Sequence, residues 1–309
     1  MMNILFAAPP DQFPLYEKHI IQYLENKKIT AHLSTNFAAE TVDYIIYAPN
    51  SVIQDFTPYT RCKAVLNLWA GVETIVKNKT LTQPLCRMVD SGLQQGMTEW
   101  VVGHTLRYHL GMDQHINNPQ KIWINNCPPL AKDRNITILG LGALGAASAR
   151  SLSQIGFKVS GWSNSSKDIE NVTTYHKKSD LKKVLNSAQI LILLLPDTPK
   201  TQNIINTQTL AYLPEGSFLI NPGRGSLIDD DALITALLSG QVAGACLDVF
   251  RTEPLPKDHP FWNISSVTVT PHIASGTRAV TASKMLVENI IRGEQGLPFL
   301  NLVDRKAGY

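Results

Sequence analysis

The sequence predicts an α/β protein made of two doubly wound, parallel-sheet domains. Short apolar runs alternate with polar, helix-compatible segments along most of the chain, which is the pattern of parallel strands joined by helices. One of these runs leads through the glycine-rich turn Gly140–Gly145 directly into a helix. The chain has 309 residues, and because a single core seldom grows beyond ~250 residues, two domains are expected.

The first domain is predicted from the N-terminal part of the chain. Its apolar runs predict buried strands at residues 3–8, 44–48, 64–68 and 86–89, with a helix at residues 16–26. The segment from Met97 to Leu110 carries its large side chains at helical spacing and contains no proline. We therefore expect a long helix there, leaving the first domain.

The second domain is predicted from the glycine-rich turn onward. Strands are expected at residues 136–139, 157–162, 190–195, 218–221, 244–249 and 267–270, and helices at residues 180–186 and 229–238. A last helix, at residues 277–292 and ended by Gly293, has too few elements around it to form a third domain. We expect it to return to the first domain, which is then discontinuous, with residues 1–100 and 274–309, while the second domain has residues 101–273.

The glycines Gly140, Gly142 and Gly145 follow the buried run Ile136–Leu139 at the spacing Gly-x-Gly-x-x-Gly. The first permits a tight turn, the second lets a pyrophosphate approach the backbone, and the third lets the helix pack on the strand. The N-terminus of that helix favours negative charge. An ordinary turn is the alternative for the pattern alone. The preceding strand, the following helix and a second strand about twenty residues later predict dinucleotide binding.

Three polar residues, Arg224, Glu253 and His272, follow three consecutive strands of the predicted second sheet. Ligands bind outside the carboxyl ends of such strands, so the three should share an edge with the glycine-rich turn. Arginine holds carboxylates, histidine exchanges protons near neutral pH, and a carboxylate orients and charges that histidine. Each also has a simpler interpretation, as a solvated turn residue, a surface-loop residue and a satisfied strand-end histidine respectively. Their joint occurrence favours a catalytic site.

Composition narrows the classes of partner. The formal net charge is +3, and the 28 basic residues form no run or stripe, so a nucleic-acid partner is not expected. The four cysteines are far apart and lack metal-ligand spacing, which predicts free thiols, a reducing compartment and no metal. Neither a signal sequence nor an apolar run of the ~20 residues that a membrane span needs is present. We expect a cytoplasmic protein without a membrane partner.

The order of these motifs resembles the D-isomer-specific 2-hydroxyacid dehydrogenases. The glycine fingerprint is followed by Arg-Gly, Asp-Val-Phe-x-x-Glu-Pro-Leu and Thr-Pro-His at similar separations. Within that family the chain is most similar to the glyoxylate/hydroxypyruvate reductase branch, through residues 161–163, 194–205 and 303–309 and, more loosely, 68–73 and 97–100. One departure is Pro222-Gly223, where the family usually has a variable residue and a small one. Because proline fixes φ and lacks an N–H, we expect the loop carrying Arg224 to differ in shape from that of the family.

The resemblance implies a Rossmann cofactor domain, a discontinuous flavodoxin-like substrate domain and the reduction of a small 2-oxo acid such as glyoxylate or hydroxypyruvate. Hydride would pass from the nicotinamide to the carbonyl carbon, while protonated His272 gives a proton to the alkoxide and Glu253 stabilises that histidine. The predicted catalytic residues are thus Arg224, Glu253 and His272. Bulky rings in the expected cleft would favour a short acid, with core packing as the alternative for both tryptophans. The predicted substrate-binding residues are Trp69, Ala70, Gly71, Val72, Trp100, Arg224 and His272.

The residues after the second strand bear on the choice of cofactor. NAD-binding units usually place Asp or Glu there to bind the ribose 2′-hydroxyl. This chain has Trp162, Ser163, Asn164 and Ser165, followed by Lys167, which suit a 2′-phosphate, although a solvated polar loop is the alternative. We expect NADPH, with NADH possible because Asn164 stands where the branch tends to have Arg. The predicted cofactor-binding residues are Gly140, Gly142, Ala143, Leu144, Gly145, Trp162, Ser163, Asn164, Ser165, Lys167, Leu195, Pro196, Pro222, Gly223 and Asp248.

Two other functions remain open at this point. One is an NAD-linked dehydrogenase of the lactate or phosphoglycerate type, which the missing acid after the second strand disfavours. The other is a non-catalytic dinucleotide-sensing regulator on the same fold, which the presence of all three polar residues disfavours. The resemblance also leads us to expect a homodimer.

Overall fold

The computed structural model describes all 309 residues and divides the chain into two compact units. Unit 1 comprises Met1–Leu93 and Thr277–Tyr309, and unit 2 comprises Gln94–Gly276. Both predicted boundaries, after residues 100 and 273, lie inside unit 2. For the first boundary the reason is visible in the helix α2 (Ser91–His109), whose side chains Met97, Val101 and Tyr108 are buried in the core of unit 2. The chain's last segment does return to unit 1.

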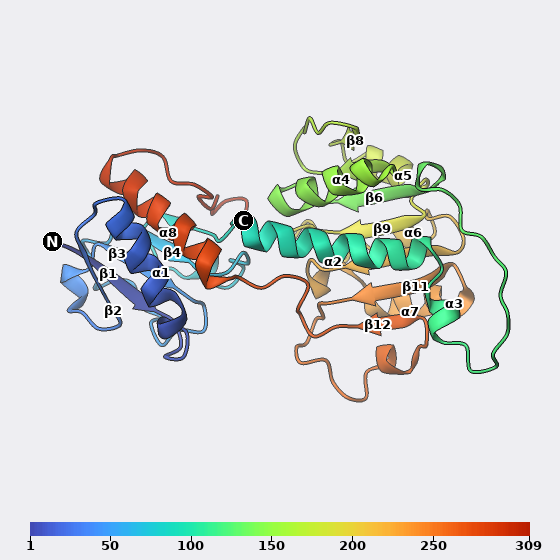
Figure 1. The fold of residues 1–309 in the computed structure, drawn as a ribbon, viewed down its shortest axis with the longest axis horizontal. Coiled ribbons are helices and arrows are strands. Elements are labelled where there is room, and N and C mark those ends of the chain that lie inside the picture. Colours follow the sequence, from blue (N-terminus) through green and yellow to red (C-terminus); the bar gives the residue numbers. More distant parts are fainter. The chain divides into compact units, whose positions relative to one another are not determined.

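Unit 1 is a five-stranded parallel sheet in the order β2-β1-β3-β4-β5. Most strand positions on this sheet are apolar and buried, as in parallel sheets covered on both faces. The helices α1 and α8 lie side by side on one face (Figure 1), where Ile20 and Leu24 share a core with Leu286 and Ile290. The elements are β1 Met2–Ala7, α1 Phe13–Asn26, β2 Ala31–Ser34, β3 Tyr44–Tyr47, β4 Ala64–Asn67, β5 Leu85–Cys86 and α8 Ala279–Glu294.

Two features of unit 1 differ from the prediction. The edge strand β2 was not predicted, because it is short and its side chains are only partly buried, so it lacks an apolar run. Gly293 lies within α8 instead of ending it. An added Cβ at Gly293 would lie 2.2 Å from Tyr44 Oη, so the glycine permits close packing of the helix on β3. The Tyr44 hydroxyl also donates to Glu294 Oε1 at 2.7 Å.

Unit 2 is a seven-stranded parallel sheet in the order β12-β11-β10-β9-β6-β7-β8. The order reverses between β6 and β9, which is where ligands bind in open α/β sheets. The elements are α2 Ser91–His109, α3 Asp113–Ile116, β6 Asn135–Leu139, α4 Ala143–Ile155, β7 Lys158–Trp162, β8 Val172–Tyr175, α5 Asp180–Leu185, β9 Ile190–Leu193, α6 Thr207–Leu210, β10 Ser217–Asn221, α7 Asp230–Ser239, β11 Val242–Leu247 and β12 Val267–Val269. Short 3₁₀ turns lie at Ala39–Thr41 and Ile75–Lys77 in unit 1 and at Ala131–Asp133, Gly225–Leu227 and Pro260–Asn263 in unit 2.

Alternating side chains of the unit 2 strands face two separate cores. Ile136, Ile138 and Ile192 pack with α2 and α4, whereas Leu191 and Leu193 pack with α7 on the other face. Helices thus cover both faces of the sheet, and loops follow the carboxyl ends of its strands (Figure 1). The edge strand β8 was missed from the sequence for the same reason as β2. Even the longest helix of the molecule lacks the apolar length to span a membrane.

Candidate active site

The glycine-rich turn has the geometry that the sequence predicts. Gly140 has φ +105°, and an added Cβ would lie 2.4 Å from Leu194 O of the neighbouring strand end. A Cβ at Gly145 would lie 1.8 Å from Gly140 O, so this glycine lets α4 start directly against its own strand. Around the position of a Cβ at Gly142 there is no atom within 4 Å. The turn therefore exposes backbone at one point and is closely packed on either side of it.

The N-terminus of α4 fits a diphosphate group. Gly142 is the N-cap of this 13-residue helix, and no side chain caps it. Ala143 and Leu144 form the first turn, where helix N–H groups lack intrahelical partners. Unpaired donors, the positive end of the helix dipole and the open space at Gly142 together suit a dinucleotide.

The end of β7 is a polar loop whose first residues are held in place. The Ser163 hydroxyl donates to Ser165 O at 2.8 Å, while Asn164 and Lys167 are exposed. The Trp162 indole donates to Lys177 O at 2.9 Å. Lys177 follows β8, so the strand missed from the sequence brings a further cation-bearing segment beside the predicted cofactor loop.

The other predicted cofactor residues lie in the loops after β9 and β10. Leu195 is buried, and Pro196 O accepts from the Thr201 hydroxyl at 2.6 Å. Pro222 and Gly223 are buried as well. The Asn221 side chain spans this turn. It accepts from the Gly223 N–H at 3.1 Å, and it donates to Arg224 O at 3.0 Å, so the proline sits in an ordered loop.

His272 and Glu253 form a direct pair at the carboxyl edge of the unit 2 sheet. His272 Nδ1 lies 2.8 Å from Glu253 Oε2, and the other carboxylate oxygen accepts from the Phe250 N–H at 2.9 Å. The side chains are 51 % and 36 % exposed, respectively, so both reach solvent. With Nδ1 facing the carboxylate, Nε2 is the nitrogen left to exchange a proton with a ligand.

The segment that carries His272 is fixed by Asp248. This residue follows β11, is fully buried, and accepts three hydrogen bonds, from the Thr270 hydroxyl at 2.6 Å and from the Ile273 and Ala274 N–H groups at 2.8 Å. His272 itself has φ +54°, in the left-handed region, and its N–H donates to Asp248 O at 2.8 Å. The predicted cofactor contact of Asp248 stays a prediction. Its part in holding the histidine loop was missed because it depends on bonds across loops.

Arg224 lies on the same edge, after β10. Its Nη1 donates to Gly223 O at 2.7 Å. An added Cβ on the next residue, Gly225, would lie 2.0 Å from the carbonyl carbon of Phe250, so the loops after β10 and β11 are in direct contact. Because β10, β11 and β12 are adjacent, the structure places Arg224, Glu253 and His272 after three neighbouring strands.

The predicted substrate residues outside this edge are placed as follows. In unit 1, Trp69 is 41 % exposed, and the buried Asn67 side chain donates to Trp69 O at 2.7 Å and Gly71 O at 3.1 Å. This amide holds the loop in which Ala70 is partly buried and Val72 is buried. Trp100 belongs to unit 2, where its ring lies 4.3 Å from that of His104 and packs partly on the core. Core packing, the alternative from the sequence, therefore describes Trp100 better than Trp69.

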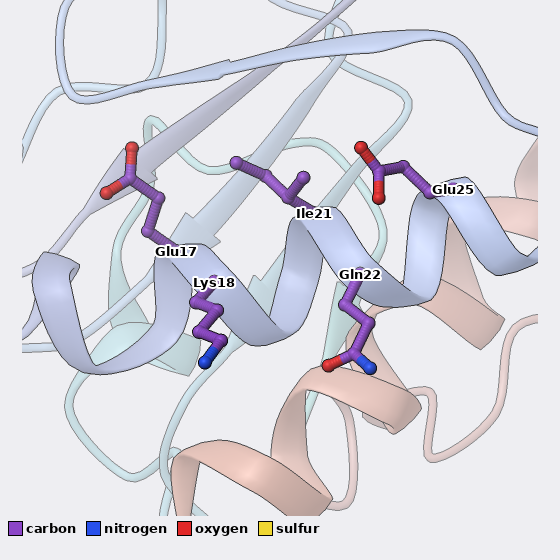
Figure 2. Close-up of a pocket in the computed structure, with 5 residues that line it drawn as sticks. All are labelled: Glu17, Lys18, Ile21, Gln22 and Glu25. Atoms are coloured by element: carbon purple, nitrogen blue, oxygen red, sulfur yellow. The ribbon is translucent and has the colours of Figure 1, made fainter.

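A shallow depression in unit 1 contains none of the predicted residues. It is lined by Glu17, Lys18, Ile21, Gln22 and Glu25, all on α1. Figure 2 shows the two glutamates on one side of the helix and the lysine and glutamine on the other. No set of polar groups converges there, so it is not a candidate active site.

Comparisons with known proteins agree with this geometry. Residues 106–274 match the family model described as D-isomer specific 2-hydroxyacid dehydrogenase, NAD binding domain. A glyoxylate/hydroxypyruvate reductase A of Serratia proteamaculans is 40 % identical over 257 residues, covering 81 % of this chain and 82 % of the relative.

Two solved structures are similar over the whole chain. A D-isomer specific 2-hydroxyacid dehydrogenase from Xanthobacter autotrophicus Py2, in complex with NADPH and MES, has a TM-score of 0.93 and 34 % identity, covering 100 % of this chain and 99 % of that one. An NADPH-dependent glyoxylate/hydroxypyruvate reductase from Sinorhizobium meliloti, in complex with NADP and sulfate, has a TM-score of 0.86 and 30 % identity, with full coverage of both chains.

Proposed function

Because this chain belongs to the D-isomer-specific 2-hydroxyacid dehydrogenase family, we propose that it reduces glyoxylate to glycolate and hydroxypyruvate to glycerate with NADPH. The observation that carries the proposal is the 2.8 Å contact between His272 and Glu253 beside the loop of Arg224. It provides a proton donor and its carboxylate partner on the sheet edge that also bears the glycine-rich turn. The names of the similar reductases support the substrate class.

The residues of this chain divide the reaction among them. The guanidinium of Arg224 binds the substrate carboxylate and polarises its carbonyl oxygen. The chemistry that a bound nicotinamide supplies is hydride for the carbonyl carbon. His272 gives the proton on Nε2 to the oxygen as the C=O bond becomes an alkoxide, and Glu253 stabilises the protonated imidazole through Nδ1. Backbone amides at Ala70, Gly71 and Val72 remain predicted carboxylate ligands, and Trp69 remains a predicted limit on substrate size.

The choice of NADPH rests on two supports. The similar structures from Xanthobacter autotrophicus and Sinorhizobium meliloti are described as complexes with NADPH and NADP. In this chain the loop after β7 offers Ser165, Asn164 and Lys167 in exposed positions without an acid among them, and a 2′-phosphate suits such donors.

Purified protein should oxidise NADPH in the presence of glyoxylate or hydroxypyruvate, with kcat/KM at least 10-fold higher for NADPH than for NADH, a difference of about 1.4 kcal/mol. An Asn164→Asp variant should reduce this ratio, because a carboxylate there repels the 2′-phosphate. The loss of absorbance of the reduced cofactor, followed at a constant 2-oxo acid concentration, measures the rates with NADPH and with NADH.

Three outcomes would contradict the proposal. A clear NADH preference together with lactate- or phosphoglycerate-type substrates would favour the NAD-linked alternative, with Asp168 reaching the ribose. NADPH binding without turnover of any 2-oxo acid would favour the sensing regulator. An unchanged cofactor ratio in Asn164→Asp would remove the loop after β7 from cofactor selection.

The protein is further proposed to be a cytoplasmic homodimer. Its four cysteines are unpaired and three are buried, which suits a reducing compartment. Residues 110–130 expose several large apolar side chains, among them Ile116, Ile122 and Leu130, and Trp123 is 93 % exposed. Exposed apolar segments of this kind mark protein interfaces. Light scattering should give twice the chain mass of 34.1 kDa, and a monomeric mass at micromolar concentration would contradict the dimer.

A further inference from the structure

Arg251 lies two residues before Glu253, in the loop after β11, and contacts both neighbouring loops of the sheet edge. Its Nη2 donates to Asn203 Oδ1, in the loop after β9, and to Ile228 O, in the loop after β10. Its Nε lies 3.7 Å from Asp230 Oδ1, at the start of α7. One guanidinium thus joins three successive loops of the carboxyl edge.

The two loops that Arg251 reaches are already joined to each other by their main chains. The Asn203 N–H donates to Ser226 O at 2.9 Å, and the Ile205 N–H donates to Leu227 O at 3.0 Å. The Asp229 N–H donates back to Ile205 O at 2.8 Å. Arg251 therefore attaches the loop of Glu253 to a preformed pair of loops, one of which carries Arg224.

The position of the Glu253 carboxylate depends on the same short loop. Its Oε1 accepts from the Phe250 N–H, and the Phe250 backbone lies against Gly225. Arg251 follows Phe250 directly in the chain. If the Arg251 side chain loses its contacts, the Phe250 backbone is free to shift, and with it both the N–H that donates to Glu253 and the contact with the Arg224 loop. Glu253 in turn contacts His272.

We propose that Arg251 is a positioning residue, which holds the Glu253 carboxylate against His272 by fastening its loop to Asn203, Ile228 and Asp230. The inference rests on the proposed reduction, for which it adds a residue that touches neither substrate nor cofactor in the proposed reaction. Arginine suits this position because its planar fork serves several acceptors at once, whereas lysine is a point charge.

The charges around Asp230 are part of this arrangement. Burial raises the pKa of the Asp230 carboxyl, and the nearby side chains of Arg251 and His259 oppose that rise. The neighbouring acids Asp229 and Asp231 add to it. Removing Arg251 therefore takes away the ion pair with Asp230 and also a cation that favours the charged form of the Asp230 carboxyl.

The test compares Arg251→Met and Arg251→Lys with the wild type. Glu253→Gln is the reference for a lost carboxylate, and Lys257→Met, on the same loop but outside the contacts of Arg251, is the matched control. Each is assayed for NADPH-dependent glyoxylate reduction across pH. Glu253→Gln removes the carboxylate that contacts His272 Nδ1, so its pH profile of activity defines the change expected when that contact is lost.

Arg251→Met should lower kcat about 10- to 100-fold, the cost of a small misplacement of a catalytic group. Its pH profile of activity should differ from that of the wild type in the same direction as the profile of Glu253→Gln, and KM for NADPH should stay near the wild-type value. Arg251→Lys should show a smaller change of the same kind, and Lys257→Met none. Hydrogen–deuterium exchange over residues 249–255 should increase in both Arg251 variants.

A wild-type pH profile in both Arg251 variants, with unchanged exchange over that segment, would overturn the positioning role. A loss of rate with an unmoved pH profile would do so as well, because a merely structural defect gives that result. If Arg251→Met does not fold, Arg251→Lys decides by the same criteria. Inactive wild-type protein would count against the proposed function, and the exchange measurement would still test the anchor.

Discussion

Replacing His272 with alanine should lower kcat for glyoxylate reduction about 10²- to 10⁴-fold, the usual share of general acid catalysis. Of the three residue types at the Arg224–Glu253–His272 edge, histidine is the one suited to exchanging a proton in the reaction, and Glu253 contacts its Nδ1. Without a proton donor, hydride transfer leaves the negative charge on the alkoxide oxygen unneutralised. NADPH affinity, measured by fluorescence titration, should change little, since the glycine-rich turn belongs to a different loop.

The backbone at this position requires a second variant. His272 has φ +54°, where alanine is strained and asparagine is tolerated. His272→Asn should therefore reproduce the loss of kcat while retaining the wild-type melting temperature, and His19→Ala, on α1, serves as the control histidine. Retained turnover in His272→Asn would remove the imidazole from proton transfer.

Replacing Asp248 with alanine should lower the free energy of unfolding by roughly 3 kcal/mol and kcat about 10- to 100-fold. The buried carboxylate accepts from Thr270, Ile273 and Ala274, so its removal leaves two main-chain donors without an acceptor. The segment that holds His272 in its left-handed conformation then loses its support. Urea unfolding measures the first effect and steady-state kinetics the second.

Asp258 supplies the comparison for this substitution. It is exposed in the loop between β11 and β12, and Asp258→Ala should change stability by no more than about 0.5 kcal/mol. Asp248→Asn should fall between the two, because one amide oxygen still accepts while the amide N–H₂ group faces other donors. Equal stability of Asp248→Ala and wild type would contradict the assigned role of these hydrogen bonds.

The sequence was sufficient for the parts of the fold that depend on local pattern. Buried central strands such as β6 and β9 are continuous apolar runs, and the glycine spacing after β6 follows from the close contacts at Gly140 and Gly145. The edge strands β2 and β8 were missed because exposed edges do not require apolar side chains. The predicted first boundary, after residue 100, lies inside unit 2, since α2 is a single helix whose side chains pack on unit 2.

For the candidate site, the sequence indicated which residue types follow which strands, but not the bonds between loops. Arg224, Glu253 and His272 were predicted from their place after successive strands, and the structure pairs the last two directly. Arg251 and Asp248 act through partners that are 20 or more positions away in the chain, for which no local pattern exists. Their contacts became visible only with the loops in place.

The contact between Gly225 and Phe250 has a consequence for recombining this site with those of related proteins. A side chain at residue 225 would enter the main chain of the adjoining loop, so neither loop accommodates a change in the other's path. Chimeras that exchange β10 and its loop alone should therefore assemble poorly. Exchanging the stretch from β10 through the loop after β11 as one block preserves the fit between the loop that carries Arg224 and the loop that carries Glu253.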